Sequence, residues 1–315
     1  MKFKQQSSNP ILCKGFTLLE LLVAMSVTVI LLGMVTFMTG VSLEGYGNSR
    51  DKVVTSREAK QALDAITRDF QAMVSRRDGN DYEWLHAQPE PKIATALGGP
   101  TDKRISNACR VIFFTGAPDR YDGDITGGSG DVSAVSYRLV YRDQISDTPA
   151  TSVGAFPTFT LYRHLVDPDD TFTNVLGQSN LTSPVSPAVN QFTDALDFTA
   201  ENVLAENIFE LSMTFIVQYV DTSGVNPVTK LERVTIGSTA GAQYSSFRMK
   251  GNGIVAAGGT NAALLGDGQL VGVEISITVL SDKGLVMTQK GGMTSADIID
   301  EYGYHYTNVI NVPRP

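Results

Sequence analysis

The chain is poor in the residues that build most metal centres and disulfide frameworks. It has two Cys and three His among 315 residues, too few for a multi-ligand zinc site or a set of disulfides. Only 18% of the residues are charged, and the net charge is −8, whereas nucleic-acid-binding proteins normally carry a basic surface. These scarcities argue against those three classes, while the length allows one large domain or two small ones.

Recognisable catalytic motifs are also missing. The sequence has no G-x-S-x-G, no H-E-x-x-H and no phosphate-binding glycine loop. His86, His164 and His305 lie far apart and outside any metal-ligand motif, so we interpret them as surface or hydrogen-bonded residues. Cys109 borders an apolar segment, which is typical of a core residue rather than a nucleophile. We predict that the protein is not an enzyme.

Two acidic clusters are candidate calcium ligands. One surrounds a glycine-rich turn and comprises Asp119, Asp122, Asp124 and Asp131. The other is the sequence D-P-D-D over residues 167–170. Calcium prefers oxygen ligands from such loops, although neither cluster has the EF-hand spacing. The alternative interpretation is solvated turn aspartates, and no other cofactor is predicted.

A long apolar run lies near the N-terminus. Residues 16–38 contain a single charge, that of Glu20. As a helix rising about 1.5 Å per residue, the run would span roughly 35 Å, enough to cross a bilayer. Residues 1–15 carry three Lys and no acid, and the next Lys or Arg is Arg50. The positive-inside rule therefore predicts a single-pass inner-membrane protein, with a cytoplasmic N-terminus and a periplasmic or extracellular C-terminal domain.

The residues at the start of this run, K-G-F-T-L-L-E over 14–20, closely resemble the N-terminal signal of type IV pilins and pseudopilins. In that family a prepilin peptidase cuts after the glycine and methylates the new N-terminus. The resemblance implies cleavage after Gly15, an N-methylphenylalanine at Phe16, and Glu20 as the fifth mature residue. Cleavage would remove Cys13 and three Lys with the leader 1–15, taking the net charge from −8 to −11.

Glu20 is expected to serve subunit assembly. A carboxylate inside a membrane helix is costly unless it is paired, so it marks a function. The resemblance implies a partner in a filament, namely the N-terminal amine of a neighbouring subunit, which only cleavage after Gly15 creates. The alternative is an ordinary signal anchor whose carboxylate reaches the membrane interface. Gly33 and Gly40 offer positions for close helix approach.

An amphipathic extension of the helix is predicted over residues 39–78, because apolar residues recur three or four apart there. The apolar positions are Val54, Leu63, Ile66, Phe70, Met73 and Val74. Gly40, Gly45 and Gly47 are expected to bend or locally melt the helix. The sequence D-G-N-D from Asp78 is expected to end it.

The remaining part, residues 79–315, is predicted to be a β-rich extracytoplasmic domain. Candidate strands cover residues 109–114, 135–141, 159–163, 209–219 and 271–279. The first should be buried, and the others should have one face on a core. Residues 171–193 should form an exposed loop, and residues 237–272, with nine Gly, an irregular excursion. The fold class is α+β, a long helix packed on a mainly antiparallel sheet with long loops.

The order of the strand candidates resembles that of two large minor subunits, the J-type pseudopilin of type II secretion and the W-type minor pilin. The resemblance implies a structural subunit that initiates or caps a type IV pilus-like or secretion filament. Its partners would be a prepilin peptidase, other pilin subunits and the inner membrane. A second hypothesis is a tip adhesin that binds through residues 171–193 or 237–272. A signal-anchored enzyme would need a catalytic set that the sequence lacks.

Overall fold

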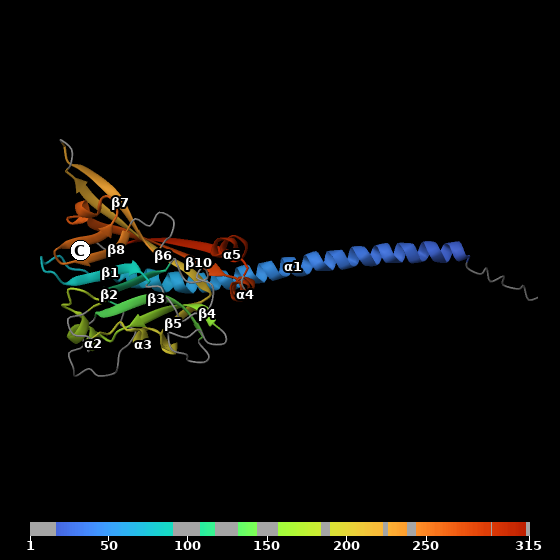
Figure 1. The fold of residues 1–315 in the computed structure, drawn as a ribbon, viewed down its shortest axis with the longest axis horizontal. Coiled ribbons are helices and arrows are strands. Elements are labelled where there is room, and N and C mark those ends of the chain that lie inside the picture. The colour runs from blue at the N-terminus through green and yellow to red at the C-terminus, as the bar shows by residue number, and fades with distance from the viewer. Residues whose placement is uncertain are drawn as a thin grey trace, which may run out of the picture. The chain divides into compact units, whose positions relative to one another are not determined.

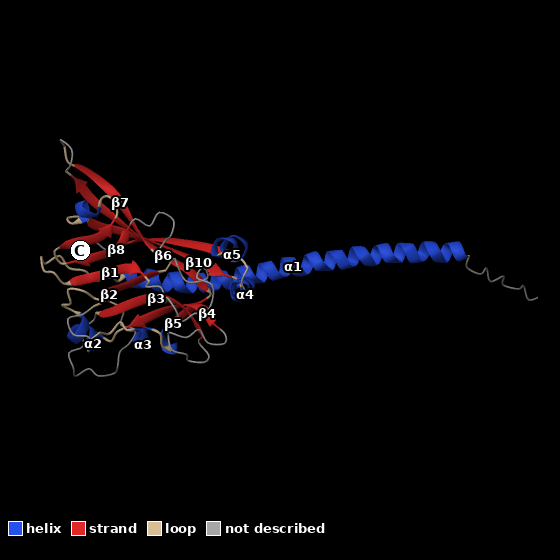
Figure 2. Cartoon of the chain, in the orientation of Figure 1, coloured by secondary structure: helices blue, strands red, loops and turns tan. Residues whose placement is uncertain are grey.

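The computed structural model describes residues 17–90, 108–116, 132–143, 157–183, 190–222, 226–237, 244–290 and 292–312. The chain divides into two compact units, Met1–Arg50 and Asp51–Pro315. Figure 1 shows a long helix and two antiparallel sheets, and Figure 2 shows that strands dominate the second unit. The predicted α+β class is therefore confirmed.

Helix α1 is continuous over Leu18–Gln71. The predicted local melting is wrong, because the helix continues through Gly40, Gly45 and Gly47; the alternative, a bend there, stays a prediction. A helical glycine costs only about 1 kcal/mol relative to alanine, so it weakens a helix without having to break it. The helix also ends before Asp78, because the chain after Gln71 pairs with a strand: the Val74 N–H donates to the Phe114 carbonyl at 2.9 Å.

Small residues form most of the buried stripe of α1. It comprises Thr55, Ala59, Ala62, Ala65, Ile66, Asp69 and Phe70. Ile66 and Phe70 agree with the predicted stripe, whereas Val54 is 40% exposed and Leu63 is half-buried. The buried stripe thus differs from the predicted one. Alanines add little to an apolar periodicity, yet they are buried here because they allow the backbone to approach closely.

Sheet A has seven strands in the order β5-β4-β3-β2-β1-β8-β9. Each neighbouring pair is antiparallel. The strands are β1 Glu83–Pro89, β2 Cys109–Thr115, β3 Ser133–Asp143, β4 Pro157–Leu165, β5 Val203–Glu206, β8 Tyr244–Lys250 and β9 Gly253–Gly258. Strand β1 thus joins early strands to a hairpin from much later in the sequence.

Sheet B has four antiparallel strands in the order β11-β10-β6-β7. They are β6 Ile208–Asp221, β7 Val228–Ile236, β10 Gln269–Leu280 and β11 Gly303–Asn311. Paired residues such as Phe215 and Val273 belong to a core that also contains Ile66 and Phe70 of α1. The Asn308 side-chain N–H donates to the Thr67 hydroxyl at 2.8 Å, which fastens β11 to the helix.

Short helices occupy the connections. The α-helices are α2 Pro168–Asp170, α3 Asp194–Asp197, α4 Asp282–Lys290 and α5 Ser295–Tyr302. Single turns of other helix types cover Thr171–Val175, Ala200–Asn202 and Ala262–Leu265. A capping box between Thr294 and Asp297 begins α5, and this helix leads directly into β11.

Three of the predictions for the β-rich part need correction. Residues 135–141 lie in β3, which is almost wholly buried on both faces rather than one. Residues 171–193 are not simply exposed, because Val175, Leu181 and Phe192 pack with Trp84 of β1. These side chains cover the face of sheet A that points away from α1, which we call its outer face. The other four predicted strands exist, as β2, β4, β6 and β10, although β4, like β3, is buried on both faces.

The third correction concerns residues 237–272, which contain the regular hairpin β8–β9. Glycines there serve turns and close contacts rather than irregular structure. Gly253 and Gly259 have positive φ angles of +135° and +71°. A Cβ on Gly259 would lie 2.3 Å from the Tyr244 ring, so glycine is what lets this ring pack against the backbone.

Candidate functional site

Reciprocal hydrogen bonds between Thr17 and Glu20 close the first turn of α1. The Thr17 amide and hydroxyl donate to Glu20 Oε2 at 3.0 and 3.1 Å, and the Glu20 amide donates to Thr17 Oγ1 at 3.2 Å. This is a capping box, which satisfies backbone donors that a helix start leaves without partners. The T-x-x-E spacing is its sequence signal, and the argument from the apolar run missed it.

Glu20, the residue that we predicted to serve subunit assembly, therefore lies at the N-terminus of a helix. A carboxylate is favoured there by the positive end of the helix dipole. Among the described residues, Oε1 of Glu20 accepts no hydrogen bond. Gly15 and Phe16, the predicted cleavage and methylation positions, lie outside the described residues.

The apolar half of α1 is suited to a bilayer by length and composition. Its large side chains are exposed, as Leu18 is at 85%. Four hydroxyls donate to backbone carbonyls of the preceding turn, each at 2.8 Å, and belong to Ser26, Thr28, Thr36 and Thr39. This internal bonding matters because unpaired polar groups are costly in hydrocarbon. Among the described residues, and leaving aside the adjoining backbone of the helix itself, no atom lies within 4 Å of a Cβ placed on Gly33 or Gly40, so both positions are open to a neighbouring helix.

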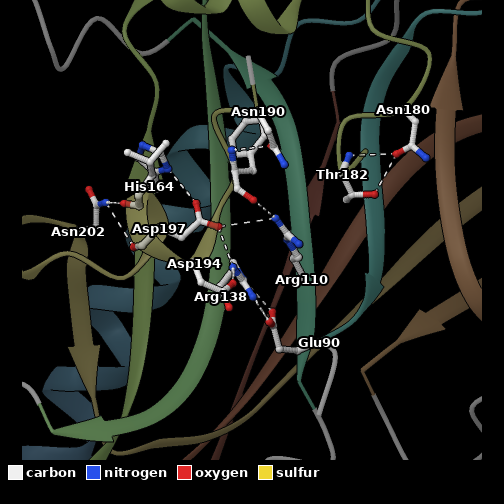
Figure 3. A network of polar contacts seen from close by, with 12 residues as sticks. Glu90, Arg110, Arg138, His164, Asn180, Thr182, Asn190, Asp194, Asp197 and Asn202 are labelled. Carbon is white, nitrogen blue, oxygen red and sulfur yellow. Dashed lines mark hydrogen bonds and ion pairs between the residues drawn. The ribbon is translucent and has the colours of Figure 1, made fainter. Parts of the chain in front are cut away.

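Arg138 of β3 is the centre of a buried ionic network on the outer face of sheet A (Figure 3). Its guanidinium donates to Asp194 at 2.7 Å, to Asp197 at 2.9 Å and to the Glu90 carboxylate. It also lies 4.3 Å from the centre of the Phe198 ring. Burial opposes the charge of Arg138, but the carboxylates of Glu90 and Asp197 outweigh it and raise the pKa of the guanidinium.

The same network fastens the segment 190–202 to the sheet. Arg110 of β2 donates to the Phe192 carbonyl at 2.8 Å and lies 3.6 Å from Asp197. His164 of β4 binds Asp197 at 2.8 Å, and Asn202 donates to the Leu196 carbonyl at 2.8 Å. These charges pair with one another across the segment and the sheet. We therefore interpret the network as a structural clamp.

A second buried cluster joins α1 to sheet A. Asp69 of the helix accepts from the Tyr137 hydroxyl at 2.6 Å and from two nitrogens of Arg163 at 2.8 and 3.0 Å. The Asp69 carbonyl also accepts from the Thr115 hydroxyl at 3.1 Å. Burial, together with the nearby Asp69 carboxylate, raises the pKa of Tyr137 well above its ordinary value. The phenol therefore stays protonated and keeps donating to Asp69.

The histidines and Cys109 have structural surroundings. His86 contacts Glu83 and Gln88, each at 3.1 Å, and His305 contacts the Thr278 hydroxyl at 2.9 Å. Within the described ranges, no three His, Cys, Asp or Glu side chains are placed to hold a metal ion. Cys109 is fully buried, and burial raises the pKa of its thiol, which disfavours the reactive thiolate.

The calcium candidates divide between described and undescribed parts of the chain. Residues 119–131, with all four aspartates of the first cluster, lie outside the described residues. In the second cluster, Asp170 accepts a hydrogen bond from Asn174 at 3.0 Å. Calcium binding stays a prediction.

Comparison with known proteins supports the interpretation of the N-terminus. The family model of the prokaryotic N-terminal methylation motif matches residues 12–36. Among solved structures, a type IV-like pilin from Thermus thermophilus is similar at 9% identity, covering 82% of this chain and 95% of its own, with a TM-score of 0.30. No curated protein matches the chain. A TM-score this low does not support an assignment of the fold family, so the interpretation of the N-terminus depends on the methylation motif.

The motif defines the N-terminus of the protein, which carries a prokaryotic N-terminal methylation motif. Residues 14–20 lie within the matched range, so the predicted resemblance of this segment to the pilin-type signal is confirmed. The motif implies processing by a prepilin peptidase and assembly with other pilins. The apolar helix that follows is consistent with membrane anchoring.

Proposed function

We propose that the protein is a minor pilin or pseudopilin, a structural subunit that initiates or caps a pilus-like or type II secretion filament. The observation that carries the proposal is Glu20, the only charge between residues 16 and 38, within the methylation motif. On this proposal the protein is not an enzyme. It spans the inner membrane once, with its C-terminal domain on the periplasmic or extracellular side.

The geometry of the cap suggests how Glu20 serves both one subunit and a filament. Both hydrogen bonds from Thr17 end on Oε2, so the carboxylate can keep its own helix capped while Oε1 accepts from a second donor. Cleavage after Gly15 would supply that donor as the methylated amine of Phe16 in a neighbouring subunit. An ammonium beside a carboxylate is a strong pairing in a medium of low dielectric constant.

The exposed apolar half of α1 supports a role in assembly. Its leucines, valines and methionines are exposed in the chain that the structure describes. In a filament that has left the bilayer, packing against neighbouring helices would remove these side chains from water, which is favourable. The proposal of a minor subunit rests on the resemblance to the J-type and W-type subunits and on a mature chain longer than that of most major pilins.

The mass of the N-terminal peptide, measured on protein purified from native membranes, tests the proposal. We expect a chain beginning at N-methyl-Phe16. Cells lacking the prepilin peptidase should yield the chain beginning at Met1, which serves as the control. A chain that retains Met1 in cells with an active peptidase would refute the pilin assignment and leave a signal-anchored domain.

A further inference from the structure

We propose that a cleft in the unit Asp51–Pro315 binds an oxyanion, either a phosphate or a carboxylate group carried by a ligand. The cleft lies between the chain that follows α1, strand β1, the hairpin β8–β9 and the start of β10. Three cationic residues line it, Arg76, Arg77 and Lys250, and we call it the arginine cleft. This binding role goes beyond filament assembly and does not depend on it.

The arginine cleft has positive charge without matching negative charge in its wall. None of its described lining residues is Asp or Glu. Lys250 is paired with Asp81 outside the wall at 2.8 Å, and this ammonium lowers the pKa of the Asp81 carboxyl. Within the described parts of the chain, Arg76 and Arg77 form no ion pair. Two guanidinium charges therefore remain for a ligand, in a protein whose net charge is −8.

The other polar groups of the cleft can also donate hydrogen bonds. Trp84 lines it and is only 7% exposed, and its indole N–H has no acceptor among the described residues. A buried donor without an acceptor costs free energy, and a bound anion is one way to recover it. Ser75 and Gln269 add a hydroxyl and an amide. A wall in which side-chain donors predominate favours an acceptor-only ligand, and an oxyanion is the ligand that arginine forks bind best.

Local contacts hold the backbone of the cleft in place. The Arg77 guanidinium donates to the Gly268 carbonyl, which ties the chain after α1 to the start of β10. The Ile254 N–H donates to the Gly266 carbonyl at 3.0 Å. A Cβ on Gly268 would lie 2.7 Å from the Val217 side chain, so the backbone there is packed directly on the core. The arginines are thus displayed on a fixed frame.

The chain contains a single tryptophan, Trp84, so its fluorescence reports directly on the cleft. The full chain in detergent micelles would be titrated with sodium phosphate and, separately, with sodium acetate, with ionic strength held constant by sodium chloride. Isothermal titration calorimetry on the same samples gives a second readout. We expect saturable binding in one of the two titrations, and the anion that saturates identifies phosphate or carboxylate chemistry.

Arg76→Gln is the test variant, because Arg77 also holds the Gly268 turn. We expect Arg76→Gln to weaken binding at least about tenfold, as loss of a charge-assisted hydrogen bond does. Arg57→Gln is the matched control, since it removes the same charge from an exposed position on α1. Thermal unfolding without anion checks that both variants remain folded. Equal affinities in the two variants, or no saturable signal by either method, would overturn the proposal.

Discussion

Gly237 determines how closely sheets A and B can meet. Its φ angle is +79°, and a Cβ added there would lie 2.5 Å from the Cys109 nitrogen and 2.8 Å from the Leu211 oxygen. These are backbone atoms next to the bridge that joins Ala108 to Leu211, and through it the two sheets. Neither atom can move aside as a flexible side chain would. Only glycine fits both the backbone angle and the space.

Gly237→Ala should therefore be far more destabilising than Gly79→Ala. Gly79 has almost the same φ angle, +80°, and in the described part of the chain no atom beyond its sequence neighbours lies within 4 Å of an added Cβ. Both variants should lose about 1 kcal/mol from the left-handed backbone conformation, but Gly237→Ala should lose at least about 2 kcal/mol more through the clash. Urea unfolding followed by circular dichroism measures both losses. Equal losses would show that the sheets can separate to admit a methyl group.

Among the elements, α1 is held to sheet A by the buried carboxylate of Asp69. One oxygen of this carboxylate accepts from both the Tyr137 hydroxyl and Arg163, and the other accepts a second bond from Arg163. Because β3 supplies the tyrosine and β4 the arginine, a single side chain of α1 connects to two strands. The stacked rings of Phe70 and Phe113, 4.2 Å apart, add an apolar contact between the helix and β2.

Asp69→Ala should cost about 3 kcal/mol of unfolding free energy, since it leaves the buried Tyr137 hydroxyl and Arg163 without this acceptor. Lys230→Ala is a suitable comparison, because it removes an exposed ion pair with Asp221 of similar length, 2.7 Å. Such surface pairs contribute less than about 1 kcal/mol. Thermal and urea unfolding would separate the two variants. A loss at Asp69 as small as that at Lys230 would contradict the assigned role.

The accuracy of the sequence predictions differed among elements for physical reasons. Strands β6 and β10 alternate between apolar and polar residues over most of their length, and both were predicted. Strands β1, β7 and β11 were missed: β7 is mostly exposed and β11 buries little, so their alternation is weak. β1 is buried, but it begins with the charged Glu83, also contains His86 and Gln88, and has no β-branched residue. The helix stripe was misplaced because four of its seven buried positions are small residues, three alanines and a threonine, and a fifth is the charged Asp69.

The polar sites could be predicted only where the signal lies within a short stretch of sequence. Glu20 was predicted as an assembly residue because a charge in an apolar run is a local signal, and the structure adds its bonds to Thr17. The network around Arg138 could not be predicted, because its partners Glu90 and Asp197 come from distant parts of the sequence. Folding alone brings them together. The arginine cleft has the same origin, since the chain that follows α1 and strand β8 are far apart in the sequence.

For the whole molecule, the question is whether assembly or adhesion depends on the Glu20 carboxylate. Glu20→Gln would keep an oxygen that can accept from Thr17, since glutamine also serves in capping boxes, but it would remove the charge. An assembly role predicts that filaments are lost in cells producing this variant. A purely adhesive role predicts normal filaments that fail to attach. Electron microscopy of surface filaments, combined with an attachment assay, distinguishes the two.

Glu44→Gln provides the control for that experiment, because it makes the same change at an exposed position on the same helix. Membrane levels of each variant, measured by immunoblot, must match those of the unaltered protein. Normal filament numbers with Glu20→Gln would mean that the carboxylate is not needed for assembly. The capping box would then be its whole role.

The strand order of sheet A has a consequence for the timing of folding. Strand β1 leaves the ribosome early, yet one of its two neighbours, β8, is made only after six further strands. Until then the half-built sheet has an open edge, which can pair with other chains. Contacts between distant parts of a chain also form slowly. On the proposed topology, this interval falls during export, so we expect the emerging chain to depend on a periplasmic chaperone that shields β1 until β8 arrives.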